Sequence, residues 1–184
     1  MAQHNFKDSK KESDIISQKH EMWNEIYSLY FPTFKYRQVV TDEQIDKSGI
    51  DAKISLGTDC PNILTIKDSQ EKYRKTKYSD ILIEHTSVQE YGTKGWIYKT
   101  HADIFVYNIL PSQECYIIPM EALSKMWIDN EKRLIKQYKS IKAYNDKYTT
   151  VSTAIPVDDL FKLLKCPKQE HYVKYNYNTR GLLS

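Results

Sequence analysis

The sequence predicts an α/β domain of α+β character, in which a central mixed sheet is flanked by helices. Segments rich in β-branched and aromatic residues follow one another from residue 49 to residue 118, and these are expected to be strands. An apolar pattern of helical spacing precedes them, and further helical segments follow them. With 184 residues, 40% of them hydrophobic, the chain can bury a substantial core.

The division of the chain follows from its composition. Residues 1–13 are charged and small and are predicted to be disordered. No repeat, low-complexity tract or linker follows, so residues 14–184 are predicted to form a single domain. Its core is expected at about 14–120, and extra C-terminal helices are expected at about 120–184.

A first helix is expected from residue 13 or 14 to about residue 30, with Trp23, Ile26 and Tyr27 on one apolar face. Pro32 ends this helix. The segment that follows has no clear pattern of a helix or a strand except for a helical turn expected at 41–46. The acidic residues of this turn are interpreted as a solvated cap.

Three short strands are predicted next, opening at 49–51 and continuing at 62–74 and 80–85, as a run of antiparallel neighbours. A strongly apolar segment at 102–110 predicts a buried strand, and residues 115–118 predict another.

The rest is predicted to be helical. Pro119 starts a helix that includes Trp127 and breaks near residues 129–130. A second helix is expected at 131–144, and a last short helix is expected to end before Pro167.

The net charge of +3 permits a nucleic-acid partner without requiring one. The cysteines Cys60, Cys115 and Cys166 contain no CxxC pair, which argues against a zinc knuckle or a disulfide framework. We therefore expect a reducing, intracellular setting, that is, the cytoplasm. The sequence shows no signal peptide and no run near the roughly 18 apolar residues of a membrane span, so no membrane partner is expected.

Residues 51 and 70–72 combine into one chemical pattern. Gln70 and Lys72 are two apart in a predicted strand, so they share a face, and Asp51 opens the preceding strand. Mg²⁺ (or Mn²⁺) prefers oxygen ligands, which Asp51, the Gln70 amide and the Glu71 carbonyl can supply. Lys72 can orient the attacking water or neutralise charge on a phosphate. The pattern predicts a metal-dependent nuclease.

Each of these residues has a simpler interpretation as well. Asp51 can cap a turn, and Gln70 and Lys72 can face solvent without a function. Asp80, Leu82 and Glu84 share one face of the third strand, where Glu84 is a candidate additional ligand or base, or else an edge-strand charge.

The segment Gly-Ile-Asp at 49–51, followed by a turn and Gln-Glu-Lys at 70–72, resembles the PD-(D/E)XK nuclease superfamily. The nearest variant is the QxK form of Mrr-type restriction endonucleases. The resemblance implies a restriction-endonuclease-like core and metal-dependent DNA cleavage. It also implies an acid from the first helix, where Glu25 is the candidate and Glu21 the next, with a surface acid as the alternative.

Double-stranded DNA is the substrate that the resemblance implies, and a homodimer fits it because a duplex offers two strands to cut. Basic residues beyond the second strand and near 94–99 are candidates to contact phosphates: Arg74, Lys75, Lys77, Lys94 and Lys99.

A rival interpretation is a catalytically silent module on the same fold that binds nucleic acid or a protein, encoded by a phage or another mobile element. It is favoured by Gln70, which stands where an acid is usual. A purely structural protein would leave the combination of Asp51 and Lys72 unexplained.

Overall fold

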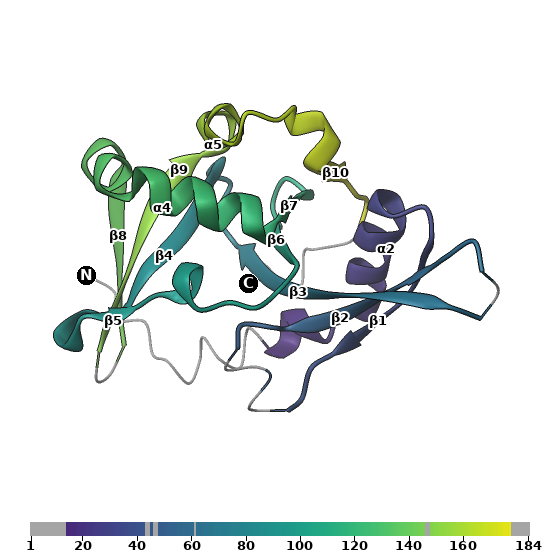
Figure 1. Cartoon of the computed structure of the whole chain (residues 1–184). Helices are drawn as coiled ribbons and strands as arrows, with labels where there is room; N and C mark the ends of the chain where they lie inside the picture. Colours follow the sequence, from purple (N-terminus) through teal and green to yellow (C-terminus); the bar gives the residue numbers. More distant parts are fainter. Residues whose placement is uncertain (1–13, 43–44, 46–47, 61, 146–147, 178–184) are drawn as a thin grey trace.

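The computed structural model describes residues 14–42, 45, 48–60, 62–145 and 148–177. The segment 1–13, predicted to be disordered, lies outside the described residues, as do residues 43, 44 and 46 of the turn expected at 41–46. The described chain builds two sheets with helices packed against them, which confirms a mixed α and β architecture (Figure 1).

The larger sheet is mixed, as predicted. Strands β1, β2 and β3 form an antiparallel meander, β6 runs parallel to β3, and β7 and β10 complete the sheet in antiparallel orientation. Its strands, in the order in which they pair, are β1 (Phe34–Val39), β2 (Ala52–Gly57), β3 (Leu64–Arg74), β6 (Ile104–Ile109), β7 (Glu114–Pro119) and β10 (Tyr172–Lys174).

A second, antiparallel sheet contains the predicted third strand, which does not pair with its predecessor. Strand β4 leaves β3 after Arg74, whose guanidinium bridges Asp80 at 2.9 Å, and it enters the other sheet. The place beside β3 goes to β6, because a wholly buried apolar strand needs cover on both faces. The smaller sheet has the order β5 (Thr93–Lys94), β4 (Asp80–Val88), β9 (Thr149–Pro156) and β8 (Lys139–Tyr144).

The C-terminal part is not purely helical, contrary to the prediction. Helix α4 (Met120–Gln137) continues through the predicted break, and Asn130 donates to the Met126 carbonyl at 2.8 Å inside the helix. Residues 139–144, expected to be helical, form β8 instead, where they pair with β9. Helix α5 (Val157–Leu164) confirms the last short helix. Short 3₁₀ turns are η1 (Gln89–Tyr91), η2 (Trp96–Tyr98) and η3 (Lys168–His171).

The first predicted helix is interrupted. Residues 14–17 are helical, and helix α2 (His20–Tyr30) starts after a break. Two side chains take up main-chain carbonyls at the break: Trp23 Nε1 donates to Ile16 O at 2.9 Å, and Arg37 donates to Ser17 O at 3.1 Å. Arg37 belongs to β1, a strand that the sequence did not predict.

Buried side chains cover both faces of the larger sheet. On one face, Trp23 and Tyr27 of α2 pack with β6 residues such as Val106. On the other face, Phe105 and Tyr107 pack with α4, α5 and the second sheet. In Figure 1, β1, β2 and β3 extend to the right, whereas α4 and the second sheet lie to the left. None of the helices among the described residues is both long and apolar enough to cross a membrane.

Candidate active site

The predicted trio meets in one pocket. The pocket has a volume of about 310 Å³, and Asp51, Gln70, Lys72 and Glu84 all contribute to its lining. Its walls come from the segment before β2, from β3, from β4 and from the turn η2 with the residues that follow it. With Lys99, which also lines the pocket, the structure therefore brings together five of the residues singled out in the sequence.

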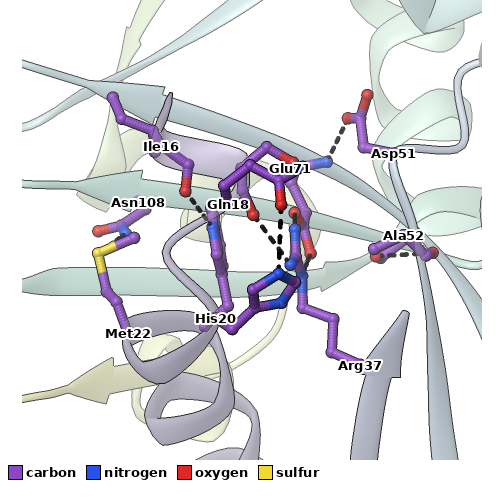
Figure 2. Close-up of polar contacts among 12 residues, drawn as sticks. Ile16, Gln18, His20, Met22, Arg37, Asp51, Ala52, Glu71 and Asn108 are labelled. Carbon is purple, nitrogen blue, oxygen red and sulfur yellow. Dashed lines mark hydrogen bonds and ion pairs between the residues drawn. The ribbon is translucent and has the colours of Figure 1, made fainter. Parts of the chain in front are cut away.

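Asp51 is held rigidly by its main chain. It lies immediately before β2, where its N–H donates to Ser69 O at 2.8 Å and its carbonyl accepts from Val40 N at 3.0 Å. Its Oδ2 atom accepts the main-chain N–H of Glu71 at 2.7 Å, as Figure 2 shows. The carboxylate is thus fixed at the neighbouring strand, with its other oxygen able to meet a ligand.

Gln70 presents a buried polar atom without a partner. The residue is 2% exposed, it lines the pocket, and its amide oxygen has no hydrogen-bond partner in the described part of the chain. A buried oxygen in this state carries an unmet desolvation cost. An amide oxygen beside a carboxylate is a ligand combination that suits a hard divalent cation. The donor set in the pocket therefore fits Mg²⁺ or Mn²⁺.

Lys72 extends into the same pocket from the next residue on that face of β3. Its Nζ atom lies 3.5 Å from Asp51 Oδ2, and its side chain is 38% exposed. The ammonium group is therefore accessible from outside and can meet a phosphate as well as Asp51. No shorter contact locks it to the carboxylate, since this distance is longer than a normal hydrogen bond.

Glu84 reaches the pocket from β4, and its Oε1 atom accepts from Ser87 Oγ at 2.5 Å. It is the second carboxylate that lines the pocket. Within the described ranges, no group of three or more His, Cys, Asp or Glu side chains is arranged to hold a metal ion. A metal here would accordingly rely on the Gln70 amide and on main-chain oxygen.

Two glycines let the pocket walls approach closely. A Cβ atom on Gly95 would lie 2.3 Å from the Glu84 carbonyl oxygen, so the chain entering η2 can lie against β4 only without a side chain. Gly49 has φ +80° and a Cβ there would meet Thr100 Oγ1 at 2.8 Å. Gly49 O also accepts from this hydroxyl at 3.3 Å, which joins two segments that line the pocket.

Glu25 is not brought to this pocket. It lies on α2, and its Oε1 atom accepts the main-chain N–H of Asn176 at 2.9 Å. Helix α2 packs on the opposite face of β3 from Gln70 and Lys72, where Tyr27 contacts Glu71. Glu21, the next candidate, belongs to the same helix. Neither acid of the first helix therefore lines the pocket, and the position implied for Glu25 by the resemblance is not the one in the structure.

Of the five residues predicted to contact phosphates, four lie outside the pocket lining and one belongs to it. Arg74 is engaged inside the fold, since it bridges Asp80 and lies over the Tyr78 ring at 5.4 Å. Lys75 is half-buried and Lys77 is exposed beyond the end of β3. Lys94 lies over the Tyr98 ring at 5.0 Å, and Lys99 is exposed and lines the pocket. Lys99 is thus the one of the five that reaches the site itself.

Sequence reasoning missed several residues around the site. Trp96 lines the pocket and stacks on Phe105 at a centroid distance of 4.9 Å. Ser87 and Thr100 also line it, but nothing in their local sequence marks them. Comparison of the chain with protein-family models, with curated proteins and with solved structures finds no match.

Proposed function

We propose that the protein is a metal-dependent endonuclease that hydrolyses DNA phosphodiester bonds. The observation that carries the proposal is the buried amide oxygen of Gln70, which lacks a partner within the described residues and belongs to a residue that lines a pocket with Asp51 and Lys72. Part of the order of elements around it supports the resemblance to the PD-(D/E)XK superfamily, although strands β4 and β5 and short 3₁₀ turns, and no α-helix, connect β3 to β6 within the described residues 75–103. A helix precedes three antiparallel strands, and a further strand runs parallel to the third of them.

Three oxygen donors would hold the metal: the Asp51 carboxylate, the Gln70 amide and the main-chain carbonyl of Glu71. When bound, Mg²⁺ would polarise the phosphate and lower the pKa of a water molecule. Glu84 is the further carboxylate in the pocket that can accept a proton or add a ligand.

Lys72 acts on the water and on the phosphate. From its place beside Asp51, the ammonium group donates to the attacking water and balances the negative charge that grows on the phosphate oxygens. Water adds to phosphorus and one P–O ester bond breaks, which leaves a phosphomonoester and a hydroxyl. Lys99 at the pocket wall binds an adjacent phosphate of the strand.

The test is cleavage of supercoiled plasmid, linear duplex and single-stranded DNA with Mg²⁺ or Mn²⁺. Asp51→Ala and Lys72→Ala are expected to abolish cutting. Lys53→Ala is the matched control, because Lys53 pairs with Asp68 at 2.9 Å outside the pocket lining. Loss of cutting in all three variants, or in none, would contradict this assignment. DNA binding without cutting in the wild type would favour the silent binding module instead.

A further inference from the structure

A buried ion pair lies beneath the candidate site, on the opposite face of β3. Arg37 Nε donates to Glu71 Oε1 at 2.7 Å, and a second guanidinium nitrogen meets Oε2 at 2.5 Å (Figure 2). The Tyr27 hydroxyl donates to Oε1 at 2.8 Å. The side chains of Arg37 and Glu71 are 0% and 4% exposed. Three donors therefore fix one carboxylate under α2.

Each of the donors stays in its donating form. Burial raises the pKa of Tyr27 well above its usual value, and the charge of Glu71 raises it further. Burial opposes the charge of Arg37, but its hydrogen bonds to Glu71 and the charge of Glu71 raise its pKa overall. Tyr27 therefore keeps its hydroxyl proton and Arg37 keeps its charge near neutral pH.

Stability alone gives little reason for this arrangement. Burying two charges costs desolvation energy, and replacing such a pair with apolar side chains of similar volume is often neutral or stabilising. The surroundings are apolar and include Trp23, whose ring lies 5.2 Å from the Arg37 guanidinium carbon. A methionine pair would fit this cluster chemically. The charged pair therefore calls for a role beyond packing.

Glu71 connects this network to the pocket through its main chain. Its N–H donates to Asp51 Oδ2 at 2.7 Å, and its neighbours Gln70 and Lys72 project into the pocket. Three donors hold the Glu71 side chain on one face of β3, and this restrains the main chain of the same residue. The orientation of the Asp51 carboxylate depends on that main chain, because the Glu71 N–H is its hydrogen-bond donor.

We propose that Arg37 and Tyr27 are positioning residues that hold the Glu71 backbone in the orientation that the metal site needs. This inference rests on the proposed function, because it concerns the same site. Partners in the shell around metal ligands commonly change affinity or activity by about 10- to 100-fold when removed. Here the partner acts through a residue whose main-chain N–H, and not its carboxylate, contacts the pocket residue Asp51.

The experiment uses the double variant Arg37→Met with Glu71→Met, which keeps every main-chain atom and leaves no unpaired buried charge. Thermal unfolding, Mn²⁺ affinity by calorimetry and the rate of plasmid cleavage are measured on the full chain. We expect a folded protein with Mn²⁺ affinity and kcat each lowered at least about tenfold. Wild-type affinity and kcat in the folded double variant would overturn the inference.

Tyr27→Phe provides a milder second test that removes a single hydroxyl. Its matched control is Tyr175→Phe, because Tyr175 is also buried in the cluster under α2 and donates to Asn108 Oδ1 at 2.8 Å. We expect Mn²⁺ affinity to fall by about tenfold, the lower end of that range, in Tyr27→Phe and to stay unchanged in the control. Equal affinities in the two variants would refute a positioning role for Tyr27.

The two levels of the proposal fail in different ways. A wild-type protein that neither binds Mn²⁺ nor cuts DNA would refute the proposed function. A wild type that does both, with variants that match it, would refute only the positioning roles of Arg37 and Tyr27.

Discussion

The ammonium group of Lys72 lies 3.5 Å from Oδ2 of Asp51, although the two residues are 21 positions apart in the sequence. Lys72 belongs to β3, and Asp51 lies immediately before β2. Both side chains are partly exposed, and ion pairs of this kind stabilise a fold by about 0–1 kcal/mol. The pair is therefore not required for folding. Its position in a pocket with a buried amide oxygen is what gives it chemical meaning.

Lys72→Met should separate activity from stability. The substitution removes a partly exposed cation but keeps most of the side-chain volume, so we expect the melting temperature to stay close to that of the wild type. Plasmid cleavage should fall by about 100-fold or more, the size seen when an electrostatic donor to a transition state is lost. A variant that cuts at the wild-type rate would contradict the role given to Lys72.

Glu84 and Glu25 should respond differently to the same change. Glu84 lines the pocket, whereas Glu25 binds the Asn176 amide behind the sheet. We expect Glu84→Gln to lower Mg²⁺-dependent cleavage about tenfold or more and Glu25→Gln to leave it unchanged. Metal titrations of cleavage would measure both. A larger loss of cleavage in Glu25→Gln than in Glu84→Gln would show that Glu25, and not Glu84, acts in the site.

The buried pair of Arg37 and Glu71 makes a prediction about folding. Arg37→Met alone leaves the Glu71 carboxylate buried without its cation, so we expect the free energy of unfolding to fall by about 3–5 kcal/mol. Urea denaturation measures this value. Adding Glu71→Met should recover most of the loss, and a double variant as unstable as the single one would contradict the account of this network.

His85 should make stability depend on pH. Burial lowers its pKa, Glu131 opposes this, and its Nε2 atom is buried without a hydrogen-bond partner among the described residues. A lowered folded-state pKa means that stability is complete above the unfolded pKa of about 6.5 and is lost as pH falls below it. His85→Phe keeps the stacking on Trp127, whose ring centroid is 5.6 Å away, and removes the titration.

Urea denaturation from about pH 8 to pH 5 would test this prediction. At the upper end the difference between wild type and His85→Phe reports packing and the loss of the hydrogen bond between His85 Nδ1 and Thr86 Oγ1 at 3.1 Å. Below about pH 6.5 the wild type should lose free energy of unfolding relative to the variant. A difference that stays constant across the range would show that His85 does not titrate in this way.

Local signals predicted the elements whose identity is decided locally. The apolar run at β6 and the spacing of Gln70 and Lys72 on β3 needed no knowledge of distant contacts. The pairing of β4 with β9, and not with β3, depends on residues about 70 positions away, so no short pattern could reveal it. The same holds for β8, whose lysine-rich sequence resembles a solvated helix until β9 pairs with it.

Some residues of the candidate site could likewise be predicted from local sequence, and others are placed there by distant contacts. Asp51, Gln70 and Lys72 could be found because their spacing has a chemical meaning of its own. Trp96 and Thr100 line the pocket only because Gly95 and Gly49 let their segments approach, which is a property of the folded chain. Glu25 was placed by resemblance, and a hydrogen bond to Asn176 at the other end of the chain decides its position.

The measurement that bears most directly on the central claim is the affinity of Mn²⁺ for the wild type and for Gln70→Leu, by calorimetry. Leucine nearly matches the buried volume of glutamine but cannot offer an oxygen to a cation. If Gln70 is a ligand, the wild type binds Mn²⁺ and the variant binds it at least about tenfold more weakly while remaining folded. Equal affinity in the two proteins, or no binding by the wild type, would contradict the claim that this pocket holds a metal.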